Sequence, residues 1–340
     1  MNKLTKIGVS ALCGSLAAVS AANAGEMSVT GGATMTYTQL SYGETGNPMG
    51  MATGLTFTGS GELDNGNAVT LTIAHDDKNT FSNAQVAYEV SGLGTFRFDQ
   101  GGGTGLDRID DMMPTAWEET TGTGVGGGLA TVSGVGGMTD IEWAVSPDML
   151  PDGMTAYISW TPKADGSKSN DKAVGGATGA PVDGSGWDVV LQSSSLGVDG
   201  LTAFAGYSSI AQAEGADSDG DRTQYAYGAK YAVGNFTLGY QVSRDNEGHH
   251  NSNTAYYDNV AWGVAFNVND NLSLSYGEHE SERARSGDTN VTLEATSMQL
   301  AYTMGGASIK IAETDFDNSS YVSTTAGDKD GTTIAVTLAF

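Results

Sequence analysis

Polar and apolar side chains alternate through most of this chain, and the connections between the alternating segments are in turn short and long. In residues 28–38, Val29, Met35 and Tyr37 fall on one face, while Ser28 and a row of threonines fall on the other. Alternation with a period of two residues is typical of a β-strand that has two different environments on its two faces. The chain is therefore restricted to all-β folds in which every strand separates two environments.

Sixteen segments of this kind follow one another along the sequence. Most have Gly, Asn, Asp or Ser at their ends, as strands in antiparallel sheets do. The predicted strands are 28–38, 54–63, 67–76, 82–90, 94–100, 137–145, 153–161, 186–192, 200–208, 222–232, 236–244, 256–267, 272–279, 291–304, 306–314 and 331–340.

The connections carry as much information as the strands. Asp64-Asn65-Gly66 is a strong hairpin signal, and other short connections contain Gly or Asn in the same way. The long ones are rich in Gly, Ser and Asp. The short connections are 64–66, 91–94, 233–235, 269–271 and 305–306, and the long ones are 40–52, 101–136, 162–185, 209–221, 245–255, 280–290 and 315–330.

Tight turns at one rim and long loops at the other predict a transmembrane, antiparallel up-and-down β-barrel of about 16 strands, with short periplasmic turns and long external loops. Closing the sheet pairs every backbone group, which lipid requires. A barrel of this size is too wide for its side chains to fill, so its interior is expected to hold water. A soluble β-sandwich or propeller is the alternative, and only the barrel would require detergent for extraction.

The N-terminus has the features of a secretory signal peptide. Lys3 and Lys6 precede the apolar stretch 7–19, and Ala22-Asn23-Ala24 is a small-x-small cleavage site. The sequence therefore predicts a cleaved segment 1–24 and a mature barrel domain 25–340. The single cysteine, Cys13, falls in the cleaved segment, so the mature chain is expected to have neither a disulfide nor a cysteine metal site.

The charge of the chain excludes one class of partner. The sequence has 15 Lys and Arg against 40 Asp and Glu, a formal net charge of -25, and so nucleic acid is not an expected partner. Only 16% of the residues are charged, which is not the composition of a disordered acidic chain.

The last predicted strand carries Ile334, Val336 and Leu338 on one face and ends the chain on Phe340. This pattern resembles the terminal signature of bacterial outer-membrane proteins. The resemblance implies that Phe340, Leu338 and Val336 form the signal read by the outer-membrane assembly machinery.

The signal peptide, the sixteen strands, the strand Leu93-Gly94-Thr95-Phe96-Arg97-Phe98 before the longest loop, and the terminal Phe340 together resemble the trimeric general porins of alphaproteobacteria. The resemblance spans essentially the whole mature chain. It implies a homotrimer in the outer membrane of a Gram-negative bacterium, in contact with outer-membrane lipid and lipopolysaccharide. It also implies that loop 101–136 folds into the barrel and constricts a pore for small hydrophilic solutes.

The expected constriction is rich in carboxylates. A set of five acidic residues faces a sparse set of basic wall residues, so we expect passive diffusion that favours cations. The acidic residues are Asp107, Asp110, Asp111, Glu118 and Glu119, and the expected opposing wall residues are Arg97, Lys230 and Lys310.

Two other functions are compatible with parts of the pattern. A channel for one specific solute keeps the same barrel, and a barrel-borne hydrolase would use Glu278-His279-Glu280, although no nucleophile accompanies that triplet. We therefore expect no enzyme activity. No cofactor is expected; Asp217, Asp219 and Asp221 form at most a loose Ca²⁺ site, because the twelve-residue loop of a calcium-binding motif is missing.

Overall fold

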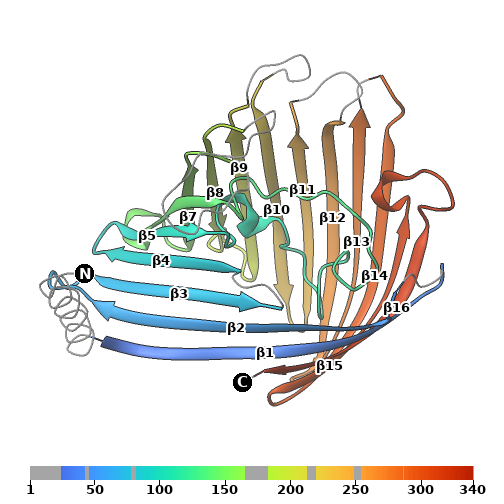
Figure 1. Ribbon diagram of the computed structural model, residues 1–340, viewed down its shortest axis with the longest axis horizontal. Helices are drawn as coiled ribbons and strands as arrows, with labels where there is room; N and C mark the ends of the chain where they lie inside the picture. The colour runs from blue at the N-terminus through green and yellow to red at the C-terminus, as the bar shows by residue number, and fades with distance from the viewer. Residues whose placement is uncertain are drawn as a thin grey trace, which may run out of the picture.

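The computed structural model describes residues 24–42, 46–77, 82–164, 183–212, 220–248, 254–285 and 287–339. Its sixteen strands form one antiparallel sheet that closes into a barrel, as the sequence predicts (Figure 1). The predicted signal peptide lies outside the described residues except for Ala24. No helix among the described residues is both long enough and apolar enough to cross a membrane.

The strands follow one another around the barrel in chain order. They are β1 (Ala24–Leu40), β2 (Met49–Glu62), β3 (Ala68–Asp76), β4 (Asn83–Val90), β5 (Gly94–Gln100), β6 (Thr139–Val145), β7 (Met154–Thr161), β8 (Gly186–Ser193), β9 (Leu201–Ile210), β10 (Arg222–Val233), β11 (Phe236–Asn246), β12 (Thr254–Asn269), β13 (Leu272–Arg285), β14 (Val291–Met304), β15 (Ala307–Asp317) and β16 (Lys329–Ala339). Three short 3₁₀ turns interrupt the connections: η1 (Gly105–Ile109), η2 (Pro147–Met149) and η3 (Ser319–Tyr321).

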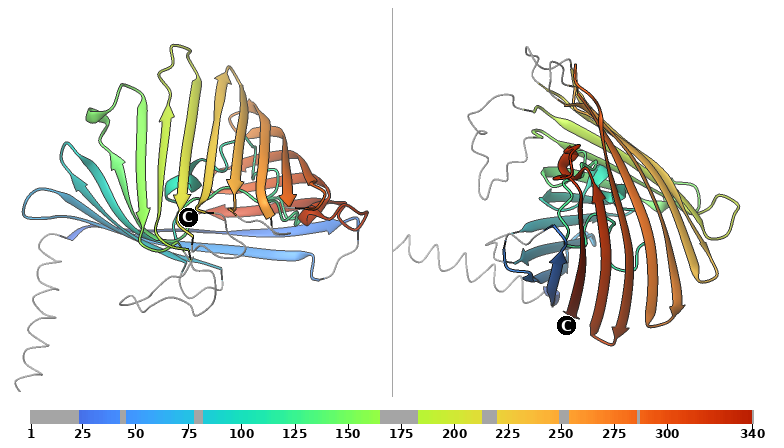
Figure 2. Two further views of the ribbon diagram at one scale, coloured as in Figure 1. Left: turned by 90° about the horizontal axis from the view of Figure 1, so that it is seen from above. Right: turned by 90° about the vertical axis from the view of Figure 1, so that its right-hand side faces the viewer.

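Pairing between the first and last strands closes the sheet. β1 pairs with β16 from Gly32 opposite Ala339 to Leu40 opposite Gly331, and on its other side it pairs with β2. Figure 2 shows the dark red β16 beside the blue β1. Closure gives every strand a hydrogen-bonded neighbour on both sides, which is the condition for a sheet to lie in lipid.

The two faces of each strand differ as the sequence pattern requires. On β14, Leu293, Ala295 and Ser297 point inward and are buried, whereas Glu294 and Met298 point outward and are exposed. Most strands expose large apolar side chains on the outer face, and this face would be unstable in water but is favourable against hydrocarbon.

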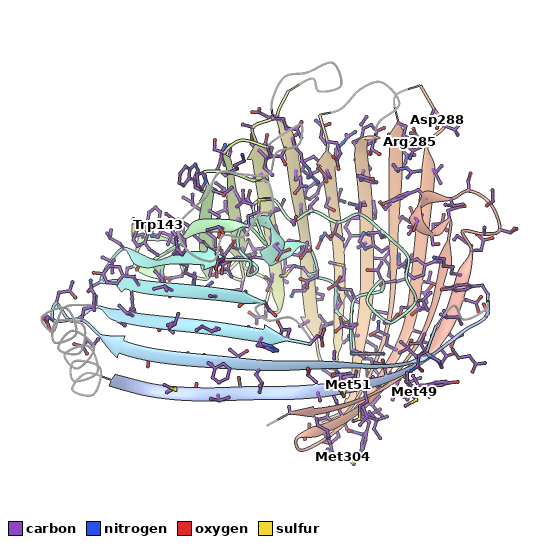
Figure 3. All side chains as sticks on the ribbon, viewed as in Figure 1. Met49, Met51, Trp143, Arg285, Asp288 and Met304 are labelled. Atoms are coloured by element: carbon purple, nitrogen blue, oxygen red, sulfur yellow. The ribbon has the colours of Figure 1, made fainter. Side chains whose placement is uncertain are left out.

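Glycines shape the tight turns at one rim. Gly66 in the β2–β3 turn has φ of 83° and Gly305 in the β14–β15 turn has φ of 59°, a left-handed conformation that other residues rarely adopt. We call this end, where Met304 lies, the short-turn rim. The opposite end is the long-loop rim (Figure 3). Arg285 and Asp288 lie there at the β13–β14 connection, with Nη1 of Arg285 4.0 Å from Oδ2 of Asp288.

Most of the large buried apolar residues lie inside the barrel, between its wall and the β5–β6 segment, which we define as residues 101–138. One cluster packs Leu106, Ile109 and Val132 of this segment against Val190 and Phe204 of the wall. A second cluster packs Val125 against side chains of β14, β15 and η3. The barrel therefore has a one-sided internal core, built where the segment covers the wall.

Two strand boundaries differ from the prediction by five residues or more. β2 begins at Met49, five residues before the predicted start, and β13 continues to Arg285, six residues beyond the predicted end. In both places the backbone pairing with the neighbouring strands continues, for example Arg283 opposite Val291. The extension of β13 has charged outward residues such as Glu280, so no apolar alternation marks it, whereas the start of β2 was missed although Met49 and Met51 lie exposed on its outer face.

Candidate functional site

The β5–β6 segment crosses the inside of the barrel. Figure 1 shows it as the green trace that leaves β5 and runs along the inner side of the later strands. Its two ends are joined: the Gly101 N–H donates to the Met138 carbonyl over 2.9 Å, and the Gly137 N–H donates to the Gly102 carbonyl over 3.0 Å. The segment is therefore a closed loop with a hydrogen-bonded neck.

The first part of the segment, residues 104–109, is fixed to the wall, and we call it the anchor stretch. The carboxylate of Asp188 on β8 accepts from the Leu106 N–H over 2.7 Å and from the Val135 N–H over 2.9 Å, so one side chain holds the outgoing and the returning chain. Thr104 donates to Asp140 on β6 over 2.8 Å. Leu106 and Ile109 are fully buried beneath these bonds.

Glu142 on β6 joins the anchor stretch to the wall by charge. Its carboxylate accepts from Arg97 of β5 over 2.9 Å, and from Nε and Nη2 of Arg108 over 2.7 and 2.5 Å. Glu142 is fully buried, and the Arg108 guanidinium also lies 4.3 Å from the centre of the Tyr157 ring. A buried carboxylate between two arginines is stable because its charge is compensated and its oxygens are hydrogen-bonded.

The next part, residues 110–119, is the acidic stretch, and polar wall side chains hold its backbone. Gln241 on β11 donates to the Asp110 carbonyl over 2.8 Å. On β14, the side-chain oxygen Oε1 of Gln299 accepts from the backbone N–H groups of Trp117 and Glu118 over 3.0 and 3.1 Å. The side-chain Nε2 of Gln299 donates to the Glu118 backbone carbonyl over 2.7 Å. The bonds use backbone groups, which leaves the carboxylates of the stretch free of these anchors.

Inward glycines let the acidic stretch lie close to the wall. A Cβ atom at Gly263 of β12 would lie 3.0 Å from the Pro114 carbonyl, and one at Gly239 of β11 would lie 3.1 Å from the sulfur of Met113. Both separations are tighter than side chains normally make, so a larger residue at either position would push the segment away from the wall.

The remainder of the segment reaches the last strands and returns. Thr123 hydrogen-bonds Thr314 of β15, and the Ala130 N–H donates to the Tyr321 hydroxyl over 3.0 Å. On the way back, Gln224 of β10 accepts from the Ser133 and Gly134 N–H groups. The segment thus covers the inner wall from β8 to β16.

The inner faces of β1 to β3 have a different character. Their inward residues are mostly threonine, serine and small residues, and Thr34 and Thr38 of β1 hydrogen-bond Thr337 and Thr333 of β16 over 2.9 and 3.0 Å. This hydroxyl wall includes Thr30, Thr34, Thr36, Thr38, Thr56, Thr58, Ser60, Thr70 and Thr72.

The carboxylates of the acidic stretch raise one another's pKa values. Burial raises the pKa of Asp110 from an ordinary value of 3.8 to about 8, and the negative charges of Asp107, Asp111 and Glu119 add to the shift. Burial also raises the pKa of Glu119 from 4.5 to about 7, with Asp111 as the main charged neighbour. The group therefore holds more negative charge as the pH rises above neutrality.

Asp107 and Glu118, at the two ends of this group, each have a cation that opposes the rise of their pKa. Burial raises the pKa of Asp107, and Asp111 adds to the effect while Arg108 opposes it. Burial raises the pKa of Glu118, while Lys310 opposes the shift. Asp111 and Glu118 are the exposed members, so they present their carboxylates to the solvent-filled interior.

The structure places the three expected basic wall residues in three settings. Arg97 is bonded to Glu142 at the base of the segment. The Lys230 amine lies 4.0 Å from the Met112 sulfur, and the Lys310 amine lies 5.8 Å from the centre of the Trp117 ring. Both lysines thus lie on the wall that the segment covers. Their predicted role as a wall opposing the acidic residues stays a prediction.

Comparison with known proteins identifies the family. The sequence profile of the Gram-negative porin family matches residues 8–303. The chain belongs to the Gram-negative porin family. This porin is accordingly a transmembrane β-barrel channel of the outer membrane. No curated protein sequence matches it.

Solved structures show the same barrel. The porin is similar to OmpF of Salmonella typhi, solved with daunomycin, at 15% identity and a TM-score of 0.69 over 92% of this chain and 97% of that one. It is similar to an anion-selective porin from Comamonas acidovorans at 12% identity and a TM-score of 0.66, over 93% and 100% of the two chains. A mutant of the Rh. blastica porin shares 15% identity over 93% and 100%, with a TM-score of 0.57. At such identities the likeness shows the fold alone.

Residues that fix the segment of this porin were not found as such from the sequence. Glu142 and Asp188 were recognisable as inward acids from their strand positions, but their partners Arg108, Leu106 and Val135 lie far away along the chain. An inward polar or acidic residue on a predicted strand is the local signal that marks such an anchor, and Gln299 of β14 follows it too.

The structure describes the remaining predicted residues only in part. Val336 faces Met35 across the closing pair of strands and Leu338 is exposed on the outer face, while Phe340 lies outside the described residues. Asp217 and Asp219 also lie outside them, and Asp221 is described. In the part of the chain that is described, no group of three or more His, Cys, Asp or Glu is placed to hold a metal ion.

Proposed function

We propose that this porin is a general diffusion channel for small hydrophilic solutes that favours cations, with the β5–β6 segment as its constriction. The observation that carries the proposal is the group of carboxylates that surrounds Asp110. The charged groups that act on it are the carboxylates of Asp107, Asp111 and Glu119. A crowded set of carboxylates beside a water-filled passage lowers the energy of a passing cation and raises that of an anion.

The hydroxyl wall supports the proposal. General diffusion requires a passage that offers hydrogen bonds without binding one solute tightly, and threonine hydroxyls both donate and accept. The fold does not decide the sign of the selectivity, because an anion-selective porin has the same barrel. The sign therefore has to come from side chains, and in this porin Asp110, Asp111, Glu118 and Glu119 are the residues we assign to it.

Replacing these four residues together, as Asp110→Asn, Asp111→Asn, Glu118→Gln and Glu119→Gln, keeps their size and removes their charge. We expect the reversal potential under a KCl gradient to move toward zero at low salt. The parent should lose its preference as salt rises, because the Debye length shrinks from about 10 Å at 0.1 M to about 3 Å at 1 M. A reversal potential unchanged at low salt would assign the selectivity to other residues and reject this filter.

Three further features are proposed from the resemblance of the sequence to trimeric porins. These are cleavage after Ala24, an assembly signal formed by Phe340, Leu338 and Val336, and a homotrimer in contact with lipopolysaccharide. Native mass spectrometry in mild detergent measures the processed mass and the number of copies together, and a single unprocessed chain would contradict both. Deleting Phe340 should lower the yield of folded barrel in the outer membrane.

A further inference from the structure

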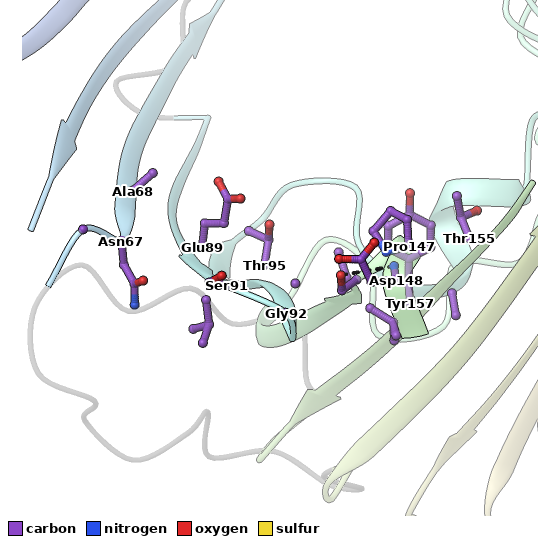
Figure 4. A pocket seen from close by; sticks show the side chains of 17 residues that line it. Asn67, Ala68, Glu89, Ser91, Gly92, Thr95, Pro147, Asp148, Thr155 and Tyr157 are labelled. Carbon is purple, nitrogen blue, oxygen red and sulfur yellow. Dashed lines mark hydrogen bonds between the residues drawn. The ribbon is translucent and has the colours of Figure 1, made fainter. Parts of the chain in front are cut away.

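A pocket of about 610 Å³ lies at the short-turn rim, away from the acidic stretch. It is enclosed by the β2–β3, β4–β5 and β6–β7 connections and by inward residues of β4, β5 and β7 (Figure 4). Pockets that hold small molecules usually have volumes of roughly 300–1,000 Å³. The pocket is therefore large enough for a small solute together with some of its water.

Two carboxylates in this pocket have no protein partner. Glu89 points inward from the end of β4, and Asp148 belongs to η2 on the other side of the pocket (Figure 4). Both are exposed, and neither carboxylate forms a hydrogen bond or ion pair with any residue that the structure describes. No Lys, Arg or His is among the described lining residues. The pocket thus offers negative charge that the protein itself does not neutralise.

Five of the other lining residues carry a hydroxyl group. Thr95, Thr155 and Ser91 line the pocket together with the Tyr157 side chain. These hydroxyls both donate and accept hydrogen bonds, so they suit a ligand that carries hydroxyl groups of its own. An ammonium group of a ligand would form a charge-assisted hydrogen bond with a carboxylate of this kind.

Two guanidinium groups near this pocket are bonded to another carboxylate. Arg97 and Arg108 lie further into the barrel, and both are bonded to the buried carboxylate of Glu142. Arg108 also covers the Tyr157 ring at 4.3 Å. Their positive charge is directed toward Glu142, so Glu89 and Asp148 remain the charged groups that face the pocket.

We propose that this pocket binds small polyhydroxylated solutes that carry one ammonium group, of the amino-sugar class, at the short-turn end of the channel. The inference rests on the proposed diffusion channel but does not depend on the acidic stretch as its filter. A solute held here is retained at the mouth of the pore, which raises its local concentration there and slows its passage.

Single-channel recording with glucosamine as the probe tests the proposal. The channel carries the four neutralising substitutions in the acidic stretch, so that only the mouth can retain the solute. Glucosamine added on the short-turn side should reduce the conductance in a saturable way, and glucose at the same concentrations should not. In the Glu89→Gln, Asp148→Asn channel, the half-saturating concentration should rise at least about tenfold, the loss expected for charge-assisted hydrogen bonds.

Glu62→Gln is the matched control. Glu62 is an exposed carboxylate at the short-turn end of β2 and does not line the pocket, so its replacement should leave the half-saturating concentration unchanged. Equal retention of glucosamine by the double variant, or equal retention of glucose, would overturn the proposed pocket. A channel that conducts but retains no glucosamine rejects only this inference, whereas a barrel that passes neither ions nor sugars rejects the proposed function.

Discussion

The anchor stretch and the acidic stretch are consecutive parts of one segment, yet carboxylates act in them in opposite ways. Around the anchor stretch, the carboxylates of Asp188 and Glu142 belong to the wall and accept hydrogen bonds from backbone N–H groups and arginines. In the acidic stretch, Asp110, Asp111 and Glu119 belong to the segment itself and face one another. Carboxylates with donors hold a structure together, whereas carboxylates without donors create a field.

The largest effect should come from breaking the charged anchor. Glu142→Gln leaves Arg97 and Arg108 without their shared charged partner, and removing one partner of a buried ion pair costs about 3 kcal/mol. We expect a clear fall in the unfolding temperature, measured by gel mobility after heating in detergent. Glu294→Gln on the outer face is the control, since Glu294 lies opposite the like-charged Glu280 and Asp317 and its loss should not destabilise the barrel.

A smaller effect is expected when the acidic stretch is released without touching its charges. Gln299→Ala removes three hydrogen bonds to Trp117 and Glu118, each worth about 1 kcal/mol. The open-channel current should become noisier and the cation preference should fall in part, while the unfolding temperature drops less than in Glu142→Gln. The exposed Gln39→Ala on the outer face of β1 is the control. Unchanged noise would show that Gln299 does not position the stretch.

The smallest effect is a dependence on pH. Because the pKa is about 8 for Asp110 and about 7 for Glu119, both are partly protonated at neutral pH. The cation preference should therefore increase from pH 6 to pH 9, as measured by reversal potentials. A raised carboxyl pKa stabilises the folded state at low pH, so the free energy of unfolding should fall as the pH rises from 3.8 toward 8.

The variant with four neutralised residues is the control for this pH dependence. Its reversal potential should change less between pH 6 and pH 9 than that of the parent, because Asp110 and Glu119 no longer titrate. A parent channel whose response is no larger than that of the variant would mean that these two carboxylates are already fully ionised at pH 6.

The sequence was sufficient for the barrel but not for the route of its inner segment. Each strand is predicted by its own local alternation of polar and apolar residues, and turns such as Asn65-Gly66 are predicted by their glycines. The end of β13 was missed because its outward residues are charged, and the start of β2 was missed although Met49 and Met51 alternate on its outer face. A local pattern therefore predicts the environment of each face of a strand, but not which distant residues the strand contacts.

The route of the segment depends on distant pairs of residues. Asp188 is 82 positions from Leu106, and Gln299 is 181 positions from Glu118. The local sequence around Asp188 or Gln299 does not predict which residue is its hydrogen-bond partner. The acidic residues could be named from the sequence because their number is a local property, whereas the link between Arg97, Arg108 and Glu142 required the folded barrel.

Chemical modification of one residue in the acidic stretch tests the central claim most directly. Cys13 is the single cysteine and lies in the predicted signal peptide, so Asp111→Cys supplies one reactive thiol at an exposed site. A negatively charged thiol reagent should preserve the cation preference, and a positively charged reagent of similar size should shift the reversal potential toward anions. The same reagents on Glu294→Cys, on the outer face, should have no effect. Equal reversal potentials after both reagents on residue 111 would contradict the account, because the acidic stretch would then lie outside the ion path.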